Sequence, residues 1–224
     1  MQNEPSTGYQ HADLIIKARW VAPVAPETGT LADHALVVRD DTIVDLLPTP
    51  LADQKWRADE TVSLDQHLLI PGLINAHTHA AMNLFRGLAD DLPLMTWLEQ
   101  HIWPAEGQWM SEGFVRDGTR LAAAEMIRSG TTCFADMYFF PETTARVAME
   151  AGLRAVLFSP VLDFPTPMGD GPDDYLRLAT EAADNWRHEP RVTIGFGPHA
   201  PYTVSDGPLE KVLTLAEELD APVM

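Results

Sequence analysis

The chain has 224 residues, of which 46% are hydrophobic and 21% are charged. This composition is typical of a globular protein, and the length suits one large domain or two small ones. The formal net charge of -18 opposes binding to a polyanion, so we expect no nucleic-acid polymer as a partner. The single cysteine, Cys133, excludes an internal disulfide and a zinc site built from several thiolates.

Membrane and secretion signals are missing from the sequence. No stretch approaches the roughly 18 uncharged apolar residues of a membrane span, and the N-terminal segment MQNEPSTGYQHAD lacks the basic and apolar regions of a signal peptide. The sequence therefore predicts a cytoplasmic protein without a membrane partner.

Short β-rich segments fill the chain up to about residue 68. Residues 12–24, 34–48 and 60–65 are rich in β-branched and other apolar side chains, and turn-forming Pro, Gly and Asp separate them. We expect residues 1–68 to form the N-terminal part of a small β-sandwich domain.

From residue 69 onward, apolar segments of strand length alternate with longer helical patterns. The expected strands are 67–79, 131–137, 154–163 and 191–201, with a fifth opening at 221–224, and the expected helices are 93–103, 111–130, 141–152, 173–188 and 206–220. Continuous apolar strands that alternate with amphipathic helices imply a parallel sheet of the α/β class. A (β/α) barrel and an open doubly wound sheet both fit this pattern.

The positions of polar residues favour the barrel. His77 and His79 end the first of these strands, and Asp136, Asp163 and His199 end the next three. In a (β/α) barrel the carboxyl ends of the strands meet on one face, where the active site is assembled. A doubly wound sheet would usually carry a Gly-rich phosphate turn after its first strand, and none occurs here.

The H-x-H pair in NAHTHAAMNLFRG (75–87) has the spacing of a metal site. Residues i and i+2 of a strand project to the same side, so His77 and His79 can face one centre while Thr78 faces away. Two neutral imidazoles suit a divalent cation such as zinc, about 2.0–2.1 Å from each nitrogen. Iron also accepts imidazole, so the ligand type leaves the metal open. The alternative is a pair of structural histidines, and the strand-end position favours the metal.

The segment PGLINAHTHAAMNLFRGLADDLPLMTWL resembles the amidohydrolase superfamily, and more narrowly the 5'-methylthioadenosine/S-adenosylhomocysteine deaminases. The similarity continues through IWPAE (102–106), GTTCFADMYFF (130–140) and GFGPHAPYTVSD (195–206). It implies a (β/α)8 TIM-type barrel of the metal-dependent amidohydrolase kind, with one metal, usually zinc. The expected reaction hydrolyses the exocyclic amine of a purine nucleoside to the inosine analogue and ammonia. By resemblance His77 and His79 are metal ligands, and Glu106 and His199 bind the substrate.

The same resemblance implies that part of the site lies outside this sequence. In the family a further metal histidine lies on the fifth strand, and a catalytic glutamate, another histidine and a metal-binding aspartate follow it. The sequence ends at Met224, where the fifth strand opens. We therefore expect residues 69–224 to be the first half of the barrel in a longer protein, with the acid/base residues beyond Met224.

The substrate prediction depends on the absence of Arg and Lys from one segment of the chain. Family members that accept S-adenosylhomocysteine hold its carboxylate with arginines from the segment after the third strand. Here no Arg or Lys occurs between Arg154 and Arg177, and Ser159 and Pro160 stand where the family has an Arg-Gly pair. We expect 5'-methylthioadenosine, with adenosine, to be preferred over S-adenosylhomocysteine.

Several alternatives stay open at this stage. Guanine, cytosine and 8-oxopurine deaminases and triazine hydrolases share the H-x-H barrel, and a non-catalytic fragment or scaffold is a further reading. Asp136 is interpreted as a brace for a loop or helix rather than a site residue. Met82, Leu84, Trp97 and Trp103 fit either an apolar substrate wall or ordinary packing. A homo-oligomer is compatible with the sequence, which does not define the oligomeric state.

Overall fold

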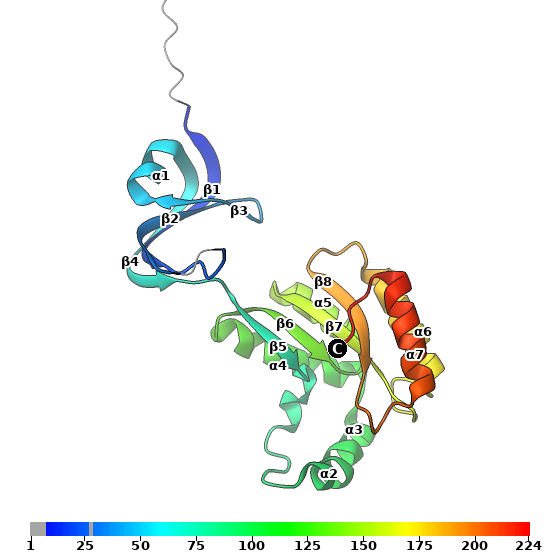
Figure 1. Ribbon diagram of the computed structural model, residues 1–224. Coiled ribbons are helices and arrows are strands. Elements are labelled where there is room, and N and C mark those ends of the chain that lie inside the picture. The colour runs from blue at the N-terminus through cyan, green and yellow to red at the C-terminus, as the bar shows by residue number, and fades with distance from the viewer. Residues whose placement is uncertain (1–7, 27–28) are drawn as a thin grey trace, which may run out of the picture. The chain divides into compact units, whose positions relative to one another are not determined.

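The computed structural model describes residues 8–26 and 29–224, and Figure 1 labels its helices and strands. The chain divides into two compact units, Met1–Pro71 and Gly72–Met224. A search of the described residues finds no helix with the length and apolar character needed to cross a membrane.

The first unit contains one four-stranded sheet in the order β3-β2-β1-β4. Its elements are β1 (Gln10–Val21), β2 (Leu31–Arg39), β3 (Thr42–Pro48), helix α1 (Thr49–Lys55) and β4 (Trp56–Leu69). β1 pairs antiparallel with β2 and parallel with β4. Ile15, Val37, Ala52 and Trp56 lie in its buried core. The sequence pattern missed α1, because seven residues with one buried side chain, Ala52, are too few to show a helical period.

The segment 67–79, expected to be one strand, is two strands in different sheets. His67–Leu69 end β4 in the first unit, and β5 (Leu73–Thr78) begins the sheet of the second. Pro71 lies between them; it has no N–H to donate to a ladder and therefore interrupts strand pairing. The single-strand prediction is wrong at this point, although the histidine end of the segment is placed as expected.

The second unit is built on four parallel strands that neighbour one another in chain order. They are β5, β6 (Thr131–Met137), β7 (Arg154–Val161) and β8 (Val192–Pro198). The last residues of the chain continue this order: the Phe196 N–H donates to Pro222 O and the Met224 N–H donates to Phe196 O, both at 3.0 Å. The parallel α/β arrangement and the opening of a further strand at 221–224 are therefore confirmed.

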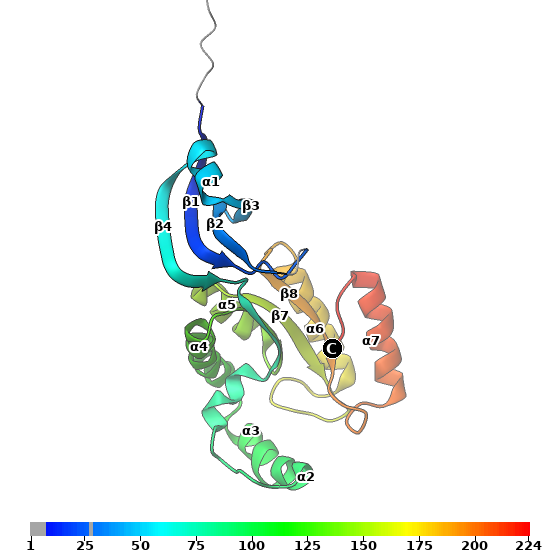
Figure 2. The same ribbon diagram turned by 60° about the vertical axis from the view of Figure 1, so that its left-hand side comes forward.

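Helices separate these strands along the chain. They are α4 (Glu112–Arg128), α5 (Pro141–Ala151), α6 (Pro172–Trp186) and α7 (Asp206–Leu219), and Figures 1 and 2 show them flanking the sheet. Ser111 caps α4, since its Oγ accepts from the Phe114 N–H at 3.2 Å. Gly152 ends α5 in the left-handed region (φ 76°), where glycine carries no steric penalty.

The connection from β5 to α4 is long and mostly helical. A 3-10 turn, η1 (Ala80–Phe85), precedes α2 (Leu94–Trp97), a π-helical turn η2 (Leu98–Ile102) and α3 (Trp103–Trp109). The helix expected at 93–103 thus extends to residue 109. Figures 1 and 2 both show α2 and α3 at one end of the second unit.

α4 approaches η1 closely because Gly118 has no side chain. A Cβ on Gly118 would lie 2.5 Å from Ala81 O and 2.8 Å from Ala81 Cα. Both atoms belong to the backbone and cannot move aside without shifting η1. The glycine therefore fixes the turn that follows His79 against the helix.

Candidate active site

His77 and His79 lie at the carboxyl end of β5 and face one another. Their ring centroids are 5.1 Å apart and their planes are nearly perpendicular, at 83°. Thr78 is turned away, with its hydroxyl 2.8 Å from Asp136 Oδ1. This is the alternation expected of a strand, with both imidazoles on one side and the intervening residue on the other.

A backbone carbonyl sets the orientation of the His79 ring. His79 Nδ1 lies 2.6 Å from Met137 O, the last carbonyl of β6. A carbonyl only accepts hydrogen bonds, so Nδ1 carries the proton and the lone pair of Nε2 is left for a ligand. An imidazole held in this way is the usual form of a metal-binding histidine.

The donor chemistry of this pair fits a divalent metal, but supplies only part of a coordination shell. A zinc site commonly has four ligands. Within residues 8–26 and 29–224, no third His, Cys, Asp or Glu lies close enough to the pair to complete a set of three. The two histidines can therefore hold a metal together with further ligands, rather than alone.

Asp136 braces the chain after β5. Its side chain is buried, with 3% exposed, and Oδ1 accepts from the Ala80 N–H at 2.6 Å and lies 2.8 Å from the Thr78 hydroxyl. Burial raises the pKa of Asp136, while these hydrogen bonds act in the opposite direction. Its carboxylate thus fixes the turn on which His79 sits, which confirms the structural interpretation of this residue.

Three of the four predicted site residues line one cavity of about 390 Å³. His79, Glu106 and His199 supply its main polar groups, and His77 is not among its lining residues. The remaining wall is largely apolar and includes Met82, Trp97, Leu98, Ile102, Trp103, Met137, Tyr138, Phe139, Pro160, Leu162, Phe164, Pro165 and Pro167. Met82, Trp97 and Trp103 therefore belong to the wall, whereas Leu84 does not. Among the described residues, those that line the cavity include no Lys or Arg.

Glu106 lies on α3 and is bound by a residue from the end of β6. The Tyr138 hydroxyl donates to Glu106 Oε1 at 2.6 Å. Burial raises the pKa of Glu106, and the hydrogen bond from Tyr138 partly offsets this. Burial and the adjacent Glu106 raise the pKa of Tyr138, so the phenol keeps its proton and acts as the donor.

His199 directly follows β8, and Thr203 orients its ring. His199 Nδ1 lies 2.9 Å from Thr203 Oγ1, and the Thr203 hydroxyl donates to Ala200 O at 3.1 Å. Because that hydroxyl has one hydrogen, Nδ1 is the donor in this pair and Nε2 is left as an acceptor in the neutral ring. Burial lowers the pKa of His199, which favours the neutral form near pH 7.

One wall of the cavity is the loop between β7 and α6, the segment whose lack of Lys and Arg carried the substrate prediction, although none of its residues was named as a site residue. Tyr175, fully buried on α6, places its hydroxyl 2.9 Å from Phe164 O, Thr166 Oγ1 and Gly169 O. Within the loop, the Thr166 N–H donates to Gly169 O at 2.9 Å. The backbone of this wall is therefore held by hydrogen bonds as well as by packing.

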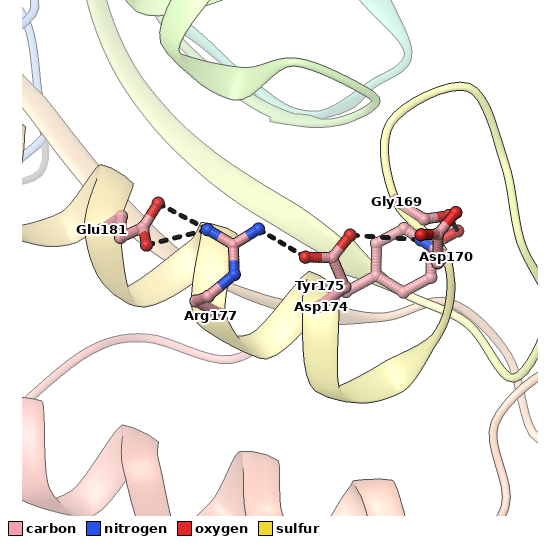
Figure 3. Close-up of polar contacts among 6 residues, drawn as sticks. All are labelled: Gly169, Asp170, Asp174, Tyr175, Arg177 and Glu181. Carbon is pink, nitrogen blue, oxygen red and sulfur yellow. Dashed lines mark hydrogen bonds and ion pairs between the residues drawn. The ribbon is translucent and has the colours of Figure 1, made fainter.

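The base of this loop is tied to the first turns of α6. Asp174 accepts from the Asp170 N–H at 3.1 Å, and Arg177 pairs with both Asp174 and Glu181, the latter at 2.8 Å. Figure 3 shows Arg177 between the two carboxylates, and Tyr175 beside Gly169 and Asp170. The ion pairs are exposed and contribute little stability, so the buried tyrosine is the main anchor.

Sequence reasoning also missed Tyr138, which contacts a predicted site residue. A signal was available, because Tyr138 follows directly on β6 and the carboxyl ends of the strands had been assigned to the site. Its partner on α3 could not be inferred, since Glu106 is 32 residues away in the chain.

Comparison with known proteins identifies the class to which this fold and site belong. Residues 68–224 match the amidohydrolase family, and the chain belongs to that family. It is 59% identical over 213 residues to a 5-methylthioadenosine/S-adenosylhomocysteine deaminase of Saccharophagus degradans, covering 95% of this chain and 48% of the relative. The chain thus spans about half the length of the curated relatives it matches.

Solved structures agree with this assignment. An adenosine deaminase from Xanthomonas campestris with bound zinc is 47% identical, with a TM-score of 0.94 over 96% of this chain and 49% of that one. An atrazine chlorohydrolase from Arthrobacter aurescens complexed with zinc shares 20% identity, with a TM-score of 0.82 over 94% and 52% of the two chains. The second likeness shows a common fold.

Proposed function

We propose that this chain supplies the first half of a metal-dependent barrel that deaminates 5'-methylthioadenosine to its inosine analogue and ammonia. Residues 1–68 are then the N-terminal part of a β-sandwich domain, and residues 69–224 are the first half of the (β/α)8 barrel. The observation that carries the proposal is the convergence of His79, Glu106 and His199 on one apolar cavity. The names of the similar proteins support it.

His77 and His79 would hold the metal, a zinc ion in this proposal, through neutral imidazoles. A bound zinc ion lowers the pKa of a water molecule so that hydroxide is available near neutral pH. In the overall reaction water supplies the new oxygen at C6 of the purine, the bond from C6 to the exocyclic nitrogen breaks, and ammonia leaves. The hydrogen bond from His79 to Met137 O keeps that ring in the tautomer that this role requires.

Glu106 and His199 would orient the nucleoside. An ionised carboxylate only accepts hydrogen bonds, and the two adjacent hydroxyls of a ribose are matched donors for Glu106. His199 presents Nε2 as a further polar contact. The apolar wall surrounds the rest of the substrate and excludes water from the cavity.

The wall favours an uncharged 5'-substituent. Phe164, Pro165 and Pro167 line the cavity together with Trp103, whose ring centroid lies 6.2 Å from that of Phe164. A methylthio group can be buried against these side chains. The carboxylate of S-adenosylhomocysteine would find no Lys or Arg among the described lining residues, and burying an unpaired charge is costly. We therefore propose a preference for 5'-methylthioadenosine, with adenosine as a second substrate.

Ultraviolet absorbance tests the reaction, because conversion of the adenine ring to hypoxanthine changes its spectrum. The full-length natural protein, loaded with zinc, is mixed with 5'-methylthioadenosine and, in parallel, with S-adenosylhomocysteine. We expect turnover of the first and much slower turnover of the second. Equal efficiency would contradict the proposed preference. Turnover of guanine, cytosine, an 8-oxopurine or a triazine, with none of the nucleosides, would overturn the proposed reaction.

Metal content tests the two ligands independently of activity. His77→Ala and His79→Ala should each lower the amount of zinc that survives dialysis, measured by elemental analysis. His188→Ala is the matched control, because His188 is exposed on the surface of the same unit. Retention of full zinc content by both ligand variants would contradict their assignment.

A further inference from the structure

Tyr138 stands out because its hydroxyl faces a carboxylate at a cavity wall. The side chain is 7% exposed and packs in a buried cluster with Met110, Val115 and Phe139. Its ring centroid lies 5.1 Å from that of Phe139. Packing on several sides fixes the ring, and therefore fixes the position of its oxygen.

Glu106 is the less constrained partner of the pair. It extends from α3, a helix of seven residues, and its neighbours Gly107 and Gln108 are exposed. The terminal torsion of a glutamate has a broad, roughly two-fold preference, so packing alone does not fix the plane of its carboxylate. The contact of 2.6 Å with Tyr138 Oη is typical of a hydrogen bond from a hydroxyl to a carboxylate. Tyr138 thus defines which way the Glu106 carboxylate faces.

We propose that Tyr138 is a positioning residue that holds the Glu106 carboxylate to receive two neighbouring hydroxyls of the substrate, and so makes the site selective for ribosides over deoxyribosides. This inference rests on the proposed function and extends it to the sugar. Tyr138 occupies one lone pair of Oε1, which leaves Oε2 and the second lone pair of Oε1 for the substrate. Tyr138 itself stays outside the chemistry, because its single hydroxyl hydrogen is donated to Glu106.

Selectivity between sugars provides a measurement that separates positioning from packing. Tyr138→Phe removes one oxygen and leaves the ring in the cluster. With the full-length, zinc-loaded protein, kcat/KM is measured for 5'-methylthioadenosine and for its 2'-deoxy and 3'-deoxy analogues. We expect the riboside to deoxyriboside ratio to fall by about tenfold in Tyr138→Phe, the size of one hydrogen bond to a charged group.

A merely structural role predicts a different result. If Tyr138 only supported the fold, Tyr138→Phe would lower kcat/KM for all three compounds by the same factor, and an unchanged ratio would overturn the inference. Tyr202→Phe is the matched control, because Tyr202 is 59% exposed and does not line the cavity. It should leave the ratio as in the wild type.

A second comparison covers the case in which the unpaired carboxylate prevents Tyr138→Phe from folding. Glu106→Gln removes the charge, and the double variant Glu106→Gln with Tyr138→Phe removes both members of the pair. These two proteins should show the same low ratio, since Tyr138 acts through Glu106; a further fall in the double variant would overturn the inference. If the wild type turns over no purine riboside, the proposed function fails and the inference fails with it. If the wild type turns over the riboside but Tyr138→Phe leaves the riboside to deoxyriboside ratio unchanged, only the inference fails.

Discussion

Replacing Tyr175 with phenylalanine should loosen the loop between β7 and α6 while leaving the ring of residue 175 buried. The lost hydroxyl lies 2.9 Å from Phe164 O, Thr166 Oγ1 and Gly169 O. Gly169 O keeps the Thr166 N–H as a donor, so the main losses are the contacts with Phe164 O and with the Thr166 hydroxyl. We expect a cost of about 1–3 kcal/mol, the range for removing one partner of a buried hydrogen bond.

Thermal denaturation of the full-length protein measures this cost. For a protein about twice the length of this chain, 1 kcal/mol corresponds to roughly 1–2 °C, so the midpoint should fall by roughly 1–6 °C. Because Phe164 lines the cavity, KM for 5'-methylthioadenosine should rise as well. Tyr202→Phe, at an exposed tyrosine of the same unit, is the control. A Tyr175→Phe midpoint equal to that of the control would refute the argument that this hydroxyl anchors the loop.

Three further predictions concern Glu106, Gly118 and Thr203. Burial raises the pKa of Glu106 above its unfolded value, so ionisation of Glu106 opposes folding as pH rises from about 4.5 through the folded pKa. Glu106→Gln should therefore raise the thermal midpoint relative to the wild type at pH 7 but not at pH 4. An equal difference in midpoint at both pH values would contradict this. Gly118→Ala should lower the free energy of unfolding by about 1–3 kcal/mol in a denaturant titration, because the added Cβ meets the backbone of Ala81. Gly113→Ala on the same helix is the control and should not destabilise the protein, because the nearest atom to its added Cβ is Ser111 Oγ at 3.8 Å. Thr203→Val removes the hydroxyl that orients His199 and should lower kcat/KM by about two- to tenfold, while the same change at exposed Thr214 should have no effect.

The sequence predicted the parallel sheet because its strands are buried runs separated by helices. β6, β7 and β8 carry almost no exposed side chains, which is why their apolar runs are continuous and recognisable. The placement of the His77 and His79 rings on one side of the strand was equally readable, since it depends only on the two-residue period of a strand. Both predictions rest on local pattern.

Features that depend on tertiary contacts were not readable from the sequence. The hydrogen bond from Tyr138 to Glu106 joins the end of β6 to α3, and no local period relates the two positions. The split of residues 67–79 was missed because the apolar pattern continues on both sides of the Pro71-Gly72 pair, and that pair was the local sign of a break. The loop at Phe164 has the composition of an ordinary turn, and no local pattern shows that the Tyr175 hydroxyl contacts its backbone.

The cavity separates two kinds of residue by the part of the chain that supplies them. The histidines come from strand ends, which the sheet holds in place, whereas Trp103 and Phe164 come from the segments that connect strands to helices. In evolution, connecting segments can change their side chains with little effect on the fold. A lineage carrying this scaffold can therefore acquire a new substrate through residues 94–107 and 163–167 while the histidines at the strand ends stay unchanged, and directed evolution aimed at those two segments would reach new substrates by the same route.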